Sequence, residues 1–373
     1  MPESDRRAAY EKFRALCQDI TDIEDEGYDL YCLRVLFENC PKTREVTIAL
    51  QGGIMRHLNA GITGFGDAMT RPYHDRHWWT SDIHQVLSVA KAAHHAGTKL
   101  DSLTLRNVPP TIFDRHRDVG DGEWRALRAL VKPLRRLRLW TNVDPPDTEE
   151  CDEIDDLDPG IRPIQRQCGQ IFEDGHLHEP LLSATELRVL ELEMPHWNPH
   201  DEGDEPEYSR LDRALGETVY SHLYELSISD CEVDEDYLVD LILRHKATLR
   251  RLYLSNISLF DFEASWRDVF HKISGKLPQL RRLRLRGAFY SANEVEIGFE
   301  PAGSESHRIA PYRDALENFI LNGGDFPTDD DNILPDQADY PDESYRPPGL
   351  RQDNTESHDP MRDYGWDEFD MRI

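Results

Sequence analysis

The fold of this chain is decided by residues 223–254, which read LYELSISDCEVDEDYLVDLILRHKATLRRLYL. The first part fits the pattern L-x-x-L-x-L-x-x-C-x-L, and its alternation of apolar and variable residues predicts a short strand with one buried face. Asp234 fits the N-cap of a helix, after which the apolar period changes to that of a helix. The apolar face of this helix contains Tyr237, Leu238, Leu241, Ile242 and His245. The stretch therefore predicts a strand, a helix and a second strand.

The strand half of this unit recurs along the chain, and repeats of this kind decide a fold before any single motif does. The copies are LDSLTL (100–105), LRRLRL (134–139), LRVLEL (187–192), LYELSI (223–228), LRRLYL (249–254) and LRRLRL (280–285), with a weaker copy TREVTI at 43–48. The helical period recurs between the copies, and further helices are expected at 29–38, 82–95, 122–131, 208–220 and 265–273, the last stopped by Gly275. The pattern predicts an α/β fold, a leucine-rich-repeat-like solenoid of irregular strand–helix repeats.

Three residues near the strand ends carry a structural interpretation. Cys231 occupies the turn position of the repeat, which favours a structural role over a reactive thiol. Asn107 and Asn256 follow their strands in the same way and are expected to turn the chain.

The domain organisation follows from the repeats and from charge. We expect an N-terminal helical cap, a repeat domain with three insertions, a C-terminal helical cap and a disordered acidic tail. Their bounds are 1–28 for the first cap, 29–300 for the repeat domain, 51–80, 144–180 and 196–207 for the insertions, 301–324 for the second cap and 325–373 for the tail. The tail holds 15 Asp and Glu against 4 Arg, a composition typical of solvated, disordered segments.

Composition excludes several classes of function. The net charge of −29 argues against general binding to nucleic acid or to anionic membranes. No apolar run approaches the roughly 20 residues that span a bilayer, and the N-terminus lacks the apolar core of a secretion signal. The six cysteines are too sparse for a disulfide scaffold and lack zinc-type spacing. We therefore expect reduced thiols and a cytoplasmic or nuclear location.

With strands and helices of this kind, the chain resembles the leucine-rich-repeat region of fungal F-box-type proteins. The resemblance rests on HKATLRRLYLSN (245–256) followed by FEASWRDVFHKI (262–273), and it covers roughly residues 29–300. It implies a protein that recognises substrates for a ubiquitin ligase. Complete members begin with an F-box, opened by Leu-Pro and an acidic–aliphatic pair, which recruits the ligase adaptor. No such motif occurs here, because the amphipathic segment 5–18 lacks that opening. The target-binding half is what the resemblance implies.

The variable positions of each strand are expected to face the concave side of the array, where a partner binds. Arginine and aromatic side chains, the usual interface anchors, gather there: Arg106, Arg136, Arg138, Trp140, Arg251, Tyr253, Arg282, Arg284 and Arg286. The acidic centre between them includes Glu191. The alternative is that these arginines only keep an exposed sheet soluble. Three arginines on one strand repel each other unless something offsets them. One candidate is the tail, whose Trp366, Phe369 and Met371 resemble a short docking element.

Catalytic and metal chemistry have little support in the sequence. The histidine groups are His74 with His77, His94 with His95, His176 with His178 and Glu179, and His196 with His200, and none shows the three or four converging ligands of a metal site. The stretch GITGFGD (61–67) lacks the framing of a phosphate loop. We expect a protein–protein interaction scaffold without cofactor, metal or enzymatic activity. The alternatives are a degenerate structural paralogue with no client and, less favoured, a hydrolase.

Overall fold

The computed structural model describes residues 11, 14–15, 18–19, 22, 26–49, 78–114, 121–141, 168–194, 209–261, 264–291, 294–299 and 309–327. The chain divides into two compact units, Met1–Leu223 and Tyr224–Ile373. Most of the three expected insertions lie outside the described residues, as does the tail from residue 328 with Trp366, Phe369 and Met371.

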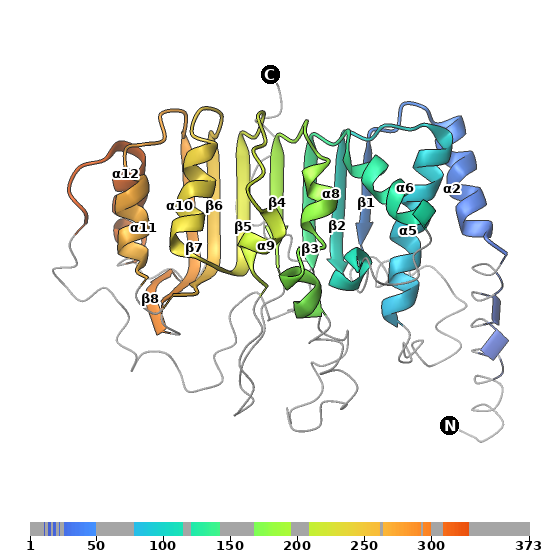
Figure 1. Cartoon of the computed structure of the whole chain (residues 1–373), viewed down its shortest axis with the longest axis horizontal. Coiled ribbons are helices and arrows are strands. Elements are labelled where there is room, and N and C mark those ends of the chain that lie inside the picture. Colours follow the sequence, from blue (N-terminus) through green and yellow to red (C-terminus); the bar gives the residue numbers. More distant parts are fainter. Residues whose placement is uncertain are drawn as a thin grey trace. The chain divides into compact units, whose positions relative to one another are not determined.

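The first unit contains four parallel strands in chain order with helices between them (Figure 1). The strands are β1 (Glu45–Ala49), β2 (Ser102–Val108), β3 (Arg136–Thr141) and β4 (Val189–Glu193). The helices are α2 (Tyr28–Asn39), α5 (Trp78–Ala96), the 3-10 helix η1 (Pro110–Phe113), α6 (Asp121–Val131), α8 (His178–Leu182) and α9 (Leu211–Leu215). They lie in front of the strands in Figure 1 and so cover one face of the sheet.

The second unit repeats this arrangement and ends differently. Its parallel strands are β5 (Glu225–Val233), β6 (Arg251–Leu259) and β7 (Arg282–Ser291), and β8 (Glu294–Phe299) pairs antiparallel with β7. Its helices are α10 (Glu235–Arg244), α11 (Trp266–Ile273) and α12 (Ile309–Asn322). The mixed α/β class is confirmed in both units. The sequence did not predict β8.

Leucines in register form the core of each unit. Leu137 pairs with Leu103 on one side and with Leu190 on the other, and all three are buried. In the second unit Leu226, Leu252 and Leu283 form the same kind of row. Because side chains alternate along a strand, these rows face the helices and the variable residues face away from them.

The helix ends explain where the chain turns. The side chain of Asp234 accepts a hydrogen bond from Tyr237 N at 2.8 Å, which confirms the expected N-cap of α10. His245 ends this helix, and its Nδ1 lies 2.8 Å from the carbonyl oxygen of Leu241. Burial lowers the pKa of His245, which fits its place in the apolar stripe. Gly275 adopts a positive φ of 65° just after α11, where a helix stop was expected.

Two segments differ from the sequence-based expectation. The helix expected at 208–220 is only α9, Leu211–Leu215, and it ends at Gly216, whose φ is 54°. Residues 168–180, the end of the insertion expected at 144–180, include a helical stretch and α8 with buried Ile171, Phe172 and Leu177. The apolar residues of this stretch pack into the first unit, so His178 and Glu179 lie on a helix and not in a loop.

Residues with a left-handed backbone lie inside or at the bend of strands in both units. Asn107, Asp230, Asn256 and Gly287 have φ of 54°, 56°, 48° and 62°. Asn256 Nδ2 donates to Asp230 Oδ1 at 3.1 Å, and Asn256 Oδ1 accepts from Ala288 N at 3.0 Å. Asn107 and Asn256 do turn the backbone, but β2 and β6 continue beyond them to Val108 and Leu259. The left-handed residues therefore do not end these strands.

Replacing Asp230 with asparagine is expected to stabilise the second unit near neutral pH. Burial raises the pKa of Asp230 from 3.8 to about 7. Since the folded state binds the proton more tightly, the stability from this group is present below about pH 4 and is lost as the pH rises through about 7. An asparagine side chain is neutral at every pH, tolerates a left-handed backbone and can still accept from Asn256. Urea unfolding should show a gain of about 1 kcal/mol near pH 8 and almost none near pH 4. An equal gain at both values would contradict this account.

A search of the described residues finds no helix that is long and apolar enough to cross a membrane.

Candidate protein-binding surface

The variable positions of the strands form what we call the strand face of each unit, the side that faces away from the helices. In the first unit it comprises Ser102, Thr104, Arg106, Arg136, Arg138, Trp140, Val189, Glu191 and Glu193. In the second unit it comprises Glu225, Ser227, Ser229, Arg251, Tyr253, Ser255, Arg282, Arg284 and Arg286. Every strand residue expected to bind a partner lies on one of these two faces.

In the first unit, three expected binding residues meet around Glu191. Arg138 Nε lies 3.1 Å from Glu191 Oε2, and Trp140 Nε1 donates to Glu191 Oε1 at 2.8 Å. Arg106 Cζ lies 4.4 Å from the centre of the Trp140 ring, a cation–π arrangement. The indole is only 8% exposed, because its neighbours cover it. A partner can therefore reach the arginines of this cluster, but little of Trp140.

Glu191 organises this cluster, although the sequence marked it only as acidic. Its strand partner is Arg138, so a register argument could have found the pair. Arg136 lies between Ser102 and Val189 on the same face and is half-buried. The cluster combines a positive rim with a fixed, buried carboxylate.

Replacing Glu191 with alanine is expected to lower the free energy of unfolding by about 2–3 kcal/mol, because it leaves the indole N–H of Trp140 without its acceptor and the partly buried Arg138 without its ion-pair partner. Glu191→Gln keeps an acceptor for Trp140 and should cost about 1 kcal/mol. Thermal unfolding of both variants, with the shift in Trp fluorescence, gives the comparison. If alanine and glutamine cost the same, the hydrogen bond to Trp140 contributes nothing.

In the second unit, Glu225 and Arg251 form the first part of a second cluster. Arg251 Nη1 donates to Glu225 Oε2 at 3.2 Å across β5 and β6. Tyr253 lies beside them and is 5% exposed. Burial raises the pKa of the Tyr253 hydroxyl, and the positive charges of Arg282 and Arg251 oppose that effect. As with Trp140, an expected aromatic anchor is covered by its neighbours.

The three arginines of β7 are offset in part by α12. Arg284 Nη1 donates to Glu317 Oε2 at 3.2 Å, and Glu317 Oε1 accepts from Leu285 N at 3.1 Å. Burial raises the pKa of Glu317, while the Leu285 N–H and Arg284 lower it. The Arg284 side chain remains 46% exposed. The expected counter-charge therefore comes from α12 within the region 301–324.

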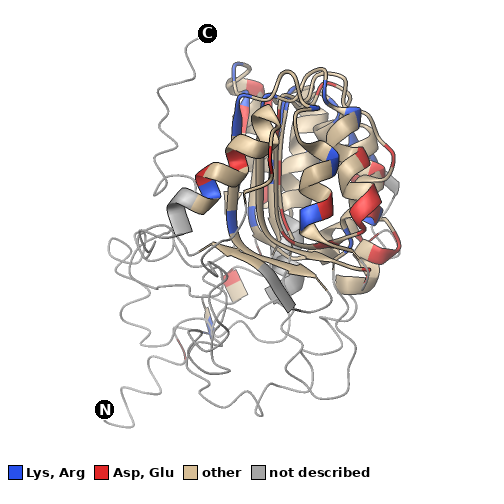
Figure 2. Ribbon diagram, turned by 90° about the vertical axis from the view of Figure 1, so that its left-hand side faces the viewer, with Lys and Arg blue, Asp and Glu red and all other residues tan. Residues whose placement is uncertain are grey.

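The strand face of the second unit carries more positive than negative charge. Arg282 is exposed and Arg286 is partly exposed. With Arg251 and Arg284 they place four arginines at the strand positions of this face, where Glu225 is the acidic residue, and Glu317 of α12 pairs with Arg284. Figure 2 looks onto the end of this unit, and blue stretches mark Lys and Arg on its strands. An excess of exposed guanidinium groups suits the binding of carboxylates.

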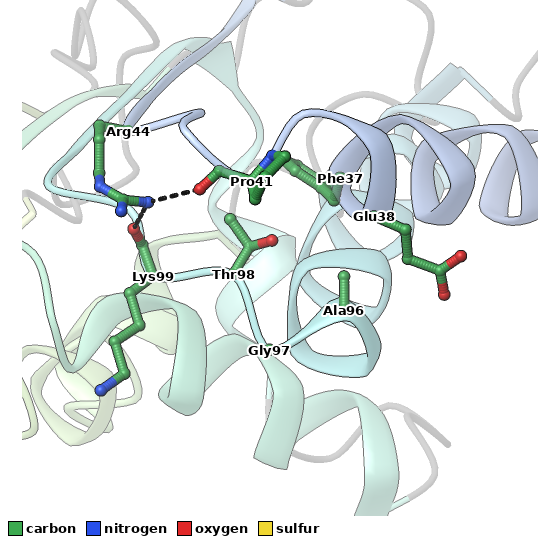
Figure 3. Close-up of a pocket in the computed structure, with 8 residues that line it drawn as sticks. All are labelled: Phe37, Glu38, Pro41, Arg44, Ala96, Gly97, Thr98 and Lys99. Carbon is green, nitrogen blue, oxygen red and sulfur yellow. Dashed lines mark hydrogen bonds between the residues drawn. The ribbon is translucent and has the colours of Figure 1, made fainter.

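One cavity lies in the first unit beside the ends of α2 and α5 (Figure 3). It has a volume of about 230 Å³, and its lining is Phe37, Glu38, Pro41, Arg44, Ala96, Gly97, Thr98 and Lys99. Arg44 Nη1 donates to the carbonyl oxygens of Pro41 and Lys99 at 3.1 and 3.4 Å, while Glu38 points away from it. Arg44 thus links the loops that follow α2 and α5. The volume of the cavity lies below the roughly 300 Å³ at which ligand pockets begin.

The group of His176, His178 and Glu179, considered as metal ligands from the sequence, has structural partners instead. His178 Nε2 lies 3.0 Å from Thr218 Oγ1, Glu179 pairs with Arg128, and His176 lies 3.9 Å from Asp114, so these three do not converge. The described ranges contain no group of three side chains that could hold a metal.

Cys231 is buried and pairs in register with Ile257, as its structural interpretation requires. Burial, together with the charges of Asp230 and Glu232, raises the pKa of its thiol well above the usual value. A thiol that resists ionisation is a poor nucleophile.

Comparisons of the chain with protein-family profiles, with curated proteins and with solved structures give no match.

Proposed function

We propose that this chain is a protein-interaction scaffold that binds an acidic segment of a partner on the strand face of its second unit. The observation that carries the proposal is the excess of arginine among the strand positions of this face: Arg251, Arg282, Arg284 and Arg286 against the single carboxylate Glu225. This excess lies in a chain whose net charge is −29. A local positive surface in an acidic protein favours acidic partners and disfavours nucleic acid.

The geometry supports recognition more than solubility alone. Glu225 and Glu317 hold Arg251 and Arg284 in place, so less side-chain freedom is lost when a carboxylate binds. The hydroxyls of Ser227 and Ser255 line the same face and can donate to a bound segment. Solubility would require only scattered charge, whereas these arginines occupy adjacent strands at matched register.

We extend the proposal to architecture and context. The in-register leucine rows and the helices that follow β1 to β6 support an irregular leucine-rich-repeat-like solenoid. In that reading the chain recognises substrates for a ubiquitin ligase in the cytoplasm or nucleus, as its resemblance to fungal F-box-type proteins implies. Co-purification of a ligase adaptor with the full chain would support this role, and a set of captured partners without any adaptor would contradict it.

The binding proposal is tested by reversing two arginines that flank Arg284. We expect Arg282→Glu with Arg286→Glu to weaken partner binding at least about tenfold and to reduce its salt dependence. Arg284 is kept because glutamate there would face Glu317. The matched control reverses the exposed Lys246 and Lys276, which lie off the strand face, by the same charge.

The readout is affinity capture with quantitative mass spectrometry, followed by titration of the main captured protein. Partners lost with the strand-face variant and kept with the control support the proposal. Partners kept with both variants, or no specific capture by the unaltered chain, would support the degenerate paralogue.

We also propose that the tail competes for this face. The described start of the tail packs on helices α11 and α12 of the second unit: the Phe326 ring stacks on His271 at 5.0 Å and meets Phe319 edge-on at 5.2 Å. A peptide of residues 359–373, which carries Trp366, Phe369 and Met371, should displace the partner. A peptide with these three residues changed to alanine serves as its control, and equal displacement by both would contradict a docking role.

A further inference from the structure

The N-terminal helix of the first unit carries an exposed apolar stripe. Tyr28, Tyr31 and Leu36 are 55%, 58% and 51% exposed, and Cys32 beside them is exposed as well. These positions follow the i, i+3, i+4, i+8 spacing of one helical face. The other side of α2 buries Phe37 and packs on α5. Three of the six large exposed apolar side chains in the described ranges thus lie on one short helix, which indicates a contact surface.

An open sheet edge lies at the same end of this unit. β1 is the first strand of the sheet, and within the described part of the chain it pairs only with β2, so its other side has no strand partner there. The carbonyl oxygen of Arg44 accepts from Asp101 N and Ser102 N, which turns that residue toward β2. By alternation, the N–H and C=O groups of Glu45, Thr47 and Ala49 point outward. In the second unit, by contrast, Glu317 and β8 cover the outer edge of β7. An open edge of this kind pairs readily with another strand.

The charge of this region favours self-association. Residues 28–49 contain three acidic residues (Asp29, Glu38, Glu45) and three basic ones (Lys42, Arg34, Arg44), although the whole chain has a net charge of −29. Arg34 and Glu38 pair within α2 at 3.2 Å. Two copies of an acidic protein repel each other least through a neutral surface.

We infer that two copies of this chain associate through β1 and α2. A two-fold axis normal to the sheet makes the two β1 strands antiparallel and places both α2 helices side by side on the same layer. A register centred on Thr47 pairs it with Thr47 of the second copy, Val46 with Ile48 and Glu45 with Ala49. No like charges face each other, and the outward backbone groups of Thr47 bond reciprocally. The two apolar stripes then cover each other.

Two variants test the two halves of this interface in the full chain, with sedimentation velocity as the readout. Tyr31→Glu with Leu36→Glu places charge in the stripe and should raise the dimer dissociation constant at least about thirtyfold. Its matched control, Leu182→Glu with Val219→Glu, changes two equally exposed apolar residues elsewhere in the unit and should leave the constant unchanged. Thr47→Pro removes one outward N–H, spares the pairing with β2 and should weaken the dimer as well.

Cysteine cross-linking gives an independent readout. Cys32 lies close to the middle of α2, so its two copies should approach the axis and form a disulfide-linked dimer under mild oxidation. Cys32→Ser should abolish that band, while Cys40→Ser, at another exposed cysteine, should not. A chain that stays monomeric up to about 100 µM, or a dimer that survives both the stripe variant and Thr47→Pro, would overturn the inference. A monomer would mean that some other segment covers α2.

Discussion

Replacing Trp266 with alanine is expected to lower the free energy of unfolding of the second unit by about 4 kcal/mol. Trp266 is fully buried at the start of α11, and its ring meets Phe289 edge-on at 4.7 Å and Phe270 at 5.5 Å. Its Nε1 donates to the carbonyl oxygen of Tyr290 at 3.0 Å, so the side chain also fixes the end of β7. Alanine would leave a large cavity and an unpaired carbonyl group. Urea unfolding followed by circular dichroism measures the change.

The same substitution should also weaken partner binding, because Trp266 packs behind the strand that carries Arg282, Arg284 and Arg286. Trp266→Phe is the control, since it keeps an aromatic ring and loses only the hydrogen bond and some volume. We expect it to cost about 1–2 kcal/mol and to leave binding nearly intact. A loss below about 1 kcal/mol for alanine would mean that this ring is not packed as described.

The repeat predicted where each strand begins. In all seven copies the strand starts two residues after the first residue of the motif, so that Leu100 and Leu223, for example, precede β2 and β5. These leading leucines are buried in the turns that enter the strands. The motif therefore encodes a buried turn plus a strand, which explains why the starts could be predicted so closely.

Strand ends were harder to predict, since a left-handed residue in a strand resembles a turn in the sequence. Asp230 and Asn256 bend β5 and β6, and pairing resumes beyond them at Cys231 and Ile257. A side-chain partner on the neighbouring strand, Asn256 for Asp230, helps to stabilise the left-handed conformation. The sequence did not predict β8 because this strand carries no copy of the motif, and it pairs antiparallel with β7 whereas the earlier strands pair in parallel.

The sequence predicted that the arginines share one face of the strands, but it did not predict their partners. Glu191 meets Arg138 through a strand 53 residues away in sequence, and Glu317 reaches Arg284 from a helix 33 residues away. Such contacts depend on how distant strands and helices pack together, which local sequence periodicity does not predict. The same contacts explain why Trp140 and Tyr253 are buried although they occupy variable positions.

Replacing Gly287 with alanine is expected to destabilise the second unit by about 3 kcal/mol. Gly287 has a φ of 62°, a conformation that costs an L-residue about 1–2 kcal/mol. A Cβ there would overlap Oδ1 of Asn256. To make room, Asn256 would give up its bonds with Ala288 N and Asp230, which link β5, β6 and β7. Each of those bonds is worth about 1 kcal/mol.

A double-mutant cycle separates the backbone strain from the overlap. Asn256→Gly keeps the positive φ of that residue (48°) while removing the side chain that a new Cβ would strike. In the Asn256→Gly background, Gly287→Ala should therefore cost only the strain, about 1–2 kcal/mol, and the coupling energy should be about 1–2 kcal/mol. If the cost of Gly287→Ala is the same in both backgrounds, the Asn256 side chain does not fill the space above Gly287. A coupling energy of this size would show that the Asn256 side chain packs directly over Gly287. Since Arg286 directly precedes Gly287 on β7, the same contact would help to fix the backbone that carries this arginine.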